Sequence, residues 1–249
     1  MNTLTITAIR ITTIMTITPR LPGPFDAVRP ETPALAALFA WFSPAFPTGG
    51  FAYSHGLETA VAEHRVRDEA GLLAWIDGVL RYGAGWSDAV LMTAAHTAAD
   101  DLPALLQLHD LAAALAPSAE RLAESLGQGE AFLIAVRGAW PDAVPPGLPD
   151  RICQAVAAGA ATARLGAPIE AALVAFLNGF ATNLIAAAIR LGICGQTAGA
   201  RLLAALGPTL IDLAERAAEA DLDDLGGCAF GSDIAAMRHE TLHARLFLS

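Results

Sequence analysis

The sequence predicts an all-α fold, and three observations lead to this prediction. The chain of 249 residues is 54% hydrophobic and rich in Ala and Leu, which favour helices. Apolar residues recur at helical spacing through most of the chain, and no β-rich segment follows residue 34. We therefore expect a single-domain helical bundle over residues 34–249, with about nine to ten helices around one core.

Residues 1–33 differ in composition from the rest of the chain. Thr and Ile alternate here, no acidic residue precedes Asp26, and a proline-rich stretch follows. The alternation has no second strand to pair with, and the segment lacks the charged start and clean apolar run of a secretory signal. We expect a disordered N-terminal extension.

The stretch Ser43–Glu58, SPAFPTGGFAYSHGLE, is the most distinctive part of the chain. It is expected to end a short helix over Ala34–Phe42. Ser54 is expected to cap a helix over residues 55–65, and Asp68 is expected to cap the next helix.

Further helices are expected along the rest of the chain. The proline-rich segment 141–149 is interpreted as a loop inside the domain. The longest apolar stretch, Ile169–Ile193, contains two charged and two amide residues, whereas a membrane span needs about 20 mostly apolar residues. We expect no membrane association. The expected helices cover residues 87–99, 103–116, 118–139, 150–165, 168–191, 197–220 and 233–248.

Charge and cysteine content exclude several classes of function. The net charge is −10, and no basic run is present, which argues against a nucleic-acid partner. All fifteen cationic side chains are Arg, so the chain has no P-loop lysine and no Schiff-base lysine. The three cysteines form no C-x-x-C pair, which fits a reducing cytoplasm and argues against a cysteine metal site.

The segment from His239 to His243 reads H-E-T-L-H on a predicted helix. Histidines four residues apart share a helix face and could bind zinc, with Glu240 as the general base of a metallopeptidase. The six residues that follow supply no third ligand. Nickel carriage by the two histidines is a further alternative, although two imidazoles alone make a weak site.

Ser54 lies in A-Y-S-H-G, a relaxed form of the nucleophile elbow of serine hydrolases. That elbow depends on a strand-to-helix turn above a parallel sheet. The prolines and glycines before Ser54 predict no strand, so a structural role as a helix cap is favoured over catalysis. The C-terminal segment, SDIAAMRHETLHARLFLS, fits core docking and a partner-binding segment equally well.

Three segments together resemble the urease accessory protein UreF family. Ser43–Glu58 is similar to the family pattern Pro-x-Gly-Gly-aromatic-x-aromatic-Ser-x-Gly-Leu-Glu, and the segments occur in family order over about residues 34–249. Residues 1–33 have no family counterpart, and Phe42 stands where a small hydroxyl residue is usual. The other matching segments are Arg190-Leu191 with Gly195-Gln196-Thr197, and Ser232-Asp233-Ile234 with Met237-Arg238-His239-Glu240 and Arg245-Leu246-Phe247.

The resemblance implies an all-α homodimer without enzymatic activity and without a cofactor of its own. It implies that the chain bridges UreD (also called UreH) and the GTPase UreG in a cytoplasmic complex that inserts nickel into apo-urease. It also implies that the carboxylate of Glu58 faces tail arginines when the tail becomes ordered on partner docking. The candidate partner-binding residues are Phe51, Tyr53, Ser54, Glu58, Arg238, His239, Glu240 and Arg245.

Overall fold

The computed structural model describes residues 32–249, and within this range the protein is all-α, as predicted. Ten α-helices and three short 3₁₀ turns form the described part of the chain, without a strand. The turns are η1 (Gly50–Ala52), η2 (Pro141–Ala143) and η3 (Leu222–Asp224). The helices are α1 (Thr32–Trp41), α2 (Leu57–Ala62), α3 (Glu69–Tyr82), α4 (Ala84–Thr97), α5 (Leu102–Ala114), α6 (Ala119–Ala139), α7 (Gln154–Arg164), α8 (Ile169–Arg190), α9 (Gln196–Glu219) and α10 (Phe230–His239).

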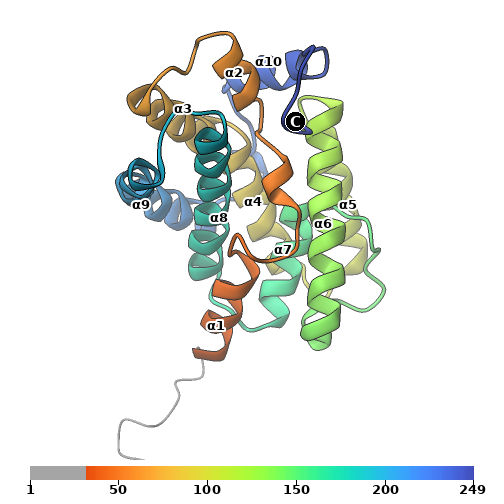
Figure 1. Ribbon diagram of the computed structural model, residues 1–249. Coiled ribbons are helices and arrows are strands. Elements are labelled where there is room, and N and C mark those ends of the chain that lie inside the picture. Colours follow the sequence, from red (N-terminus) through yellow and green to blue (C-terminus); the bar gives the residue numbers. More distant parts are fainter. Residues whose placement is uncertain (1–31) are drawn as a thin grey trace, which may run out of the picture.

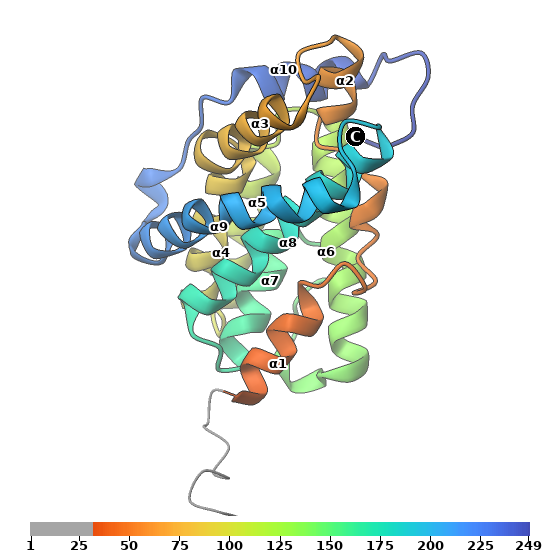
Figure 2. The same cartoon turned by 60° about the vertical axis from the view of Figure 1, so that its left-hand side comes forward.

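The two ends of the bundle are built from different parts of the chain. Helices α2 and α10 lie together at one end, and α1 lies at the other (Figures 1 and 2). The long helix α6 runs between these ends, with its N-terminus beside the C-terminal end of the chain (Figure 1). This arrangement brings residues near 54, 120 and 245 into one region.

Small residues let the central helices approach closely. A Cβ added to Gly159 on α7 would lie 2.2 Å from the carbonyl oxygen of Met92 on α4, and one added to Gly129 on α6 would lie 1.9 Å from that of Ile152. Because these contacts involve backbone atoms, no side chain at either position could be accommodated without a backbone shift. Alanines on α7, buried from residue 155 to residue 161, complete the close packing.

Helix α8 is the one described helix that is long and apolar enough to cross a membrane. Half of its most apolar window is buried inside the protein, against α9, α4, α2, α3 and α1. A Cβ at Gly179 would lie 2.9 Å from the carbonyl oxygen of Phe42, so the small face of α8 receives the end of α1. This packing makes α8 a core helix of the bundle, as expected from its interrupting polar residues.

The starts of α1 and α2 differ from prediction, and the predicted cap of α3 is confirmed. Asp68 caps α3 as expected, because its side chain accepts a hydrogen bond from Gly71 N. Helix α2, however, begins at Leu57 after Gly56, whose φ of 75° lies in the left-handed region. The prediction of Ser54 as the N-cap was therefore wrong. The predicted extension, residues 1–33, lies outside the described residues except for Thr32 and Pro33, which form the start of α1.

The last helix is much shorter than predicted. Helix α10 ends at His239, whereas the periodicity predicted a helix through residue 248. Thr241 Oγ1 donates to the carbonyl of Arg238 at 3.1 Å, and Leu242 N donates to that of His239 at 3.0 Å, so a turn replaces the next helical turn. The ten residues Glu240–Ser249, called the tail below, then fold back over α2 and α6.

Candidate docking site for the C-terminal tail

The tail is held first by its backbone against the stretch before α2. Leu248 N donates to the carbonyl of Ala52 at 2.8 Å, and Ser54 N donates to that of Ser249 at 2.8 Å. The Ser54 hydroxyl also donates to the Ser249 carbonyl and accepts from Glu58 N at 3.3 Å. Ser54 is completely buried, so its role is to fix the tail and the start of α2 to one another.

Gly56 determines how closely α10 approaches this site. A Cβ at this position would lie 2.8 Å from Ala236 N and 3.1 Å from the Ser232 carbonyl oxygen, both in α10. Any other residue would push α10 away, in addition to the strain of its positive φ. Glycine here places the end of α10 directly over α2.

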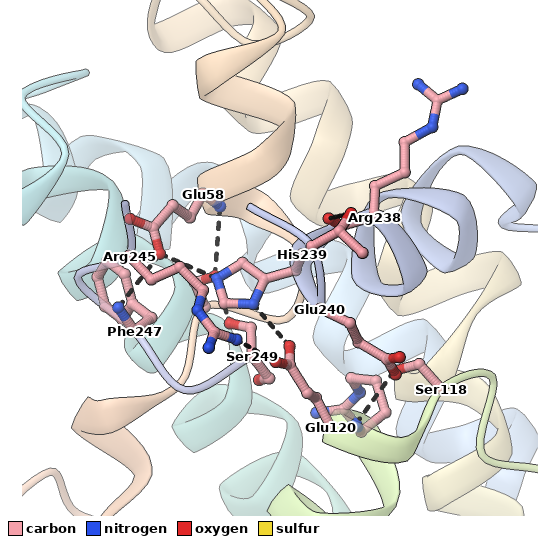
Figure 3. A network of polar contacts seen from close by, with 12 residues as sticks. Glu58, Ser118, Glu120, Arg238, His239, Glu240, Arg245, Phe247 and Ser249 are labelled. Atoms are coloured by element: carbon pink, nitrogen blue, oxygen red, sulfur yellow. Dashed lines mark hydrogen bonds and ion pairs between the residues drawn. The ribbon is translucent and has the colours of Figure 1, made fainter. Parts of the chain in front are cut away.

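Glu58 is the main acceptor for the tail (Figure 3). Its carboxylate accepts from Leu246 N at 2.8 Å and from Phe247 N at 3.1 Å, and it lies 3.0 Å from His239 Nε2. Only 6% of Glu58 is exposed. A buried carboxylate is stable only when its oxygens are hydrogen-bonded or paired, and here the tail backbone and a ring nitrogen meet that requirement.

Glu120 holds the other side of the tail. Its Oε2 lies 2.6 Å from His239 Nδ1, and its Oε1 pairs with the guanidinium of Arg245. Glu240 Oε1 accepts from Ala119 N at 2.9 Å and thereby satisfies a free amide at the start of α6. The N-terminal turn of α6 is thus tied to the end of α10 through His239 and to the tail through Glu240 and Arg245.

A cation–π contact covers the outer side of the tail. The Phe247 ring is buried, and the guanidinium carbon of Arg190 lies 4.0 Å from its centroid. Arg190 also donates to the carbonyl of Phe51, so it joins η1 to the tail. We call the set that fixes the tail the tail junction: Ser54, Glu58, Glu120, Glu124, Arg190, His239, Arg245, Phe247 and Ser249.

A buried charge cluster lies next to the tail junction. Glu124 accepts from the hydroxyl of Ser249, pairs with Arg121 and lies 3.3 Å from His55 Nδ1. Burial alone would raise the pKa of Glu124, but Arg121 and then His55 outweigh it and hold that pKa well below its usual range. Burial, followed by the charge of Arg121, lowers the pKa of His55 to about 4. Glu124 is therefore ionised and His55 neutral at pH 7.

The same cluster lines a cavity of about 200 Å³. Burial, with a smaller contribution from Glu124, raises the pKa of Asp88 to about 6. Nε2 of His55 is buried without a hydrogen-bond partner, and Gln128 and Asn183 also line the space. Such a polar cavity has room for ordered water molecules, which would satisfy these groups.

Five of the eight residues predicted from the sequence meet in the tail junction or touch it directly. Ser54, Glu58, His239 and Arg245 belong to it, and Glu240 caps α6 beside it. The expected pairing of Glu58 with tail arginines was wrong, because Arg245 pairs with Glu120.

The other three predicted residues lie around the tail junction. Arg238 points outward to Glu63 at 2.9 Å, and 71% of Phe51 is exposed. Tyr53 is half-buried and lines the cavity, where burial raises its pKa.

The structure does not form either enzymatic arrangement. His239 and His243 do not share a helix face, because α10 ends at His239, and both ring nitrogens of His239 face carboxylates. Within residues 32–249, no group of three or more His, Cys, Asp or Glu side chains is placed to hold a metal ion. The Ser54 hydroxyl donates to a backbone carbonyl, and no sheet surrounds it in this range.

Sequence reasoning missed five residues of the tail junction as docking residues, namely Glu120, Glu124, Arg190, Phe247 and Ser249. Glu120 and Glu124 looked like ordinary charges on a helix, and the only available signal was their spacing of one helical turn after a capping serine. Phe247 and Arg190 lay in segments that resembled the family, but their contact links residues 57 positions apart in the sequence. Such contacts depend on the packed fold.

The fold and the site together define an all-α protein built around a docked C-terminal segment that a polar junction holds in place, over the described residues 32–249. The UreF family profile matches residues 66–207. A urease accessory protein UreF of Mesorhizobium japonicum is 48% identical over 221 residues, which cover 89% of this chain and 99% of that protein. The UreF proteins of Rhizobium leguminosarum bv. viciae (47%; 88% and 98% covered) and Brucella ovis (46%; 88% and 95% covered) are also similar. The chain belongs to the UreF family of urease accessory proteins.

Proposed function

We propose that this protein is a non-catalytic urease-maturation chaperone of the cytoplasm. In this proposal it acts as a homodimer, bridges UreD/UreH and the GTPase UreG, and so supports nickel insertion into apo-urease. The relatives' names support a role in urease maturation. Nickel and GTP are handled by the complex, and this chain supplies binding surfaces rather than reacting groups.

The docked tail is the observation that carries this proposal. It buries Phe247 and Ser249 but leaves Leu246 and Leu248 exposed at 70% and 61%. Phe51, 71% exposed, lies on the stretch that the tail contacts. Large apolar side chains on a fixed backbone are typical anchors of protein interfaces. Among the eight residues predicted from the sequence, Phe51 would therefore act by direct contact. Those that contact the tail or belong to it would hold it in its binding shape, namely Ser54, Glu58, His239, Glu240 and Arg245.

Co-expression with UreD/UreH and UreG, followed by co-purification, tests the proposal. We expect all three chains to purify together, and Leu248→Asp to weaken the complex without changing the helical content of the isolated protein. Ile134→Asp on α6, where 62% of the side chain is exposed, is the matched control and should leave complex formation unchanged. A wild-type chain that joins neither partner would exclude the bridging role.

Arg245→Ala tests whether an ion pair that holds the tail contributes to partner binding. Its guanidinium pairs with Glu120 and is 41% exposed, so its loss should leave the bundle folded but reduce the amount of complex recovered. Recovery of the complex at the wild-type level would show that this ion pair does not contribute to partner binding.

A further inference from the structure

The cavity beside the tail junction carries a negative charge that no neighbouring side chain balances. Arg121 and Glu124 on its wall pair with each other and together contribute no net charge. His55 is neutral at pH 7, because burial lowers its pKa to about 4. Asp88, the remaining charged group on this wall, has neither a hydrogen bond nor an ion pair within residues 32–249. Its carboxyl pKa of about 6 leaves it mostly ionised at pH 7.

The Nε2 atom of His55 is a second acceptor without a partner. Nδ1 of this ring lies 3.3 Å from the ionised carboxylate of Glu124, so Nδ1 carries the hydrogen and donates it. The lone pair is therefore on Nε2, which is buried and accepts no hydrogen bond within the described part of the chain. The cavity thus offers two acceptors to an occupant, the Asp88 carboxylate and His55 Nε2.

Aromatic rings form much of the remaining wall. The ring of Phe180 lies 4.7 Å from that of His55 and nearly perpendicular to it. Trp41 Nε1 is a buried donor without a hydrogen-bond partner, but its ring packs edge-to-face against Phe132 and Trp140 at 5.5 and 5.6 Å. Aromatic faces attract cations and accommodate small alkyl groups. The phenylalanines on the wall are Phe42, Phe46, Phe176 and Phe180.

We infer that this cavity binds a small ammonium-type cation, a protonated amine whose N–H groups donate to the Asp88 carboxylate and to His55 Nε2. The volume of about 200 Å³ has room for several non-hydrogen atoms. The cation balances the charge of Asp88, and the phenylalanine rings surround its alkyl part. This site goes beyond the proposed function in urease maturation and does not depend on it.

Other occupants satisfy the cavity less completely. Water molecules can donate to both acceptors but leave the carboxylate charge unbalanced, and a buried unpaired charge is costly. An anion would meet two carboxylates, Asp88 and Glu124. Within residues 32–249, no group of three or more His, Cys, Asp or Glu side chains is placed to hold a metal ion. A cation that carries its own N–H donors meets both the charge and the two acceptors.

NMR titration of the full-length protein with three probes of similar size tests the charge of the ligand. The probes are methylammonium, the uncharged methanol and the anion acetate, with sodium chloride added to equal ionic strength. We expect methylammonium to produce saturable shifts of the backbone amides of His55 and Asp88 and of the His55 Nε2 resonance. Methanol should bind at least about tenfold more weakly, because its hydrogen bonds lack charge assistance, and acetate should not bind.

Asp88→Asn tests the residue that supplies the charge. The amide keeps the size of the side chain and one acceptor oxygen, so the affinity for methylammonium should fall by at least about tenfold while the helical content stays unchanged. Asp110→Asn is the matched control, because Asp110 is exposed on α5 and does not line the cavity. This variant loses the same charge and should keep the wild-type affinity.

The comparison of probes in the wild-type protein stands even if Asp88→Asn fails to fold. A cavity that gives no saturable response to methylammonium holds water alone, and this result would overturn the inference. Equal affinities for methylammonium and methanol, or binding of acetate, would overturn it as well. Equal methylammonium affinity in folded Asp88→Asn and in Asp110→Asn would show that the cation binds elsewhere.

Discussion

The helical core and the tail junction are stabilised by different interactions. In the core, apolar faces of α4, α6, α7 and α8 pack around small residues such as Gly159. In the tail junction, a few carboxylates carry most of the contacts, and Glu58 alone receives two amides and a ring nitrogen. The core is therefore stabilised by many small apolar contacts, whereas the tail junction is stabilised by a few specific polar atoms.

This difference predicts two modes of failure. Loss of a core side chain should destabilise the whole bundle, because apolar burial is shared among many neighbours. Loss of a junction carboxylate should release the tail while the helices remain folded, because the contacts it makes are confined to one end. Substitutions in the two regions should therefore separate global from local unfolding.

Phe132→Ala should give the largest effect. Phe132 on α6 is 1% exposed and contacts the rings of Trp41, Phe42 and Phe46 at centroid distances of 5.5, 6.2 and 5.8 Å. Its removal should lower the free energy of unfolding by about 3–5 kcal/mol, as measured by urea denaturation. Ile134→Ala, on the same helix but 62% exposed, should change it by less than about 0.5 kcal/mol.

Glu58→Ala should give a smaller and local effect. Two backbone amides and His239 lose their acceptor, and unsatisfied buried groups cost about 1–3 kcal/mol each unless the tail leaves the site. We expect tail amides to lose most of their protection from hydrogen exchange while amides of α7 and α8 keep theirs. Equal loss of protection in the core would contradict the separation of the two regions.

The sequence predicted the core well because its information is local. The spacing of apolar residues predicts one face of α3, and its members are buried except Leu73, which is half-buried: Leu72, Leu73, Ile76, Val79 and Leu80. The side chain of Asp68 caps the same helix through Gly71, three residues away. These features depend only on neighbours in the chain.

The tail junction could not be predicted in the same way. His239 contacts Glu58 and Glu120 across 181 and 119 residues, and those partners become apparent only in the folded chain. The end of α10 at His239 has the same origin, because helical periodicity continues past this residue while the carboxylates redirect the tail. The resemblance to UreF located the segments but misassigned the partner of Glu58.

The charge cluster beside the junction should show opposing effects of pH on stability. His55 has a pKa lowered from 6.5 to about 4, so the unfolded chain binds the extra proton first and stability falls as pH drops through this range. Asp88 has a pKa raised from 3.8 to about 6, so the folded protein binds the proton first and gains stability on acidification.

Substitution should reveal each contribution separately. In His55→Asn, where Asn tolerates the positive φ of 58°, the loss of stability between pH 6.5 and 4 should be smaller than in the wild type. In Asp88→Asn the loss should be larger, with differences on the order of 1–3 kcal/mol at about 1.4 kcal/mol per pKa unit. Urea denaturation across this pH range measures both, and identical slopes in the three proteins would contradict the burial of these groups.

Arg238→Ala should have the smallest effect, although the sequence marked Arg238 and Arg245 as equivalent tail arginines. Arg238 is 60% exposed in its ion pair with Glu63, and such surface pairs contribute about 0–1 kcal/mol. Neither stability in urea nor the hydrogen-exchange protection of Leu246 should change measurably. A drop in that protection as large as the one expected for Glu58→Ala would mean that Arg238 also holds the tail and belongs to the tail junction.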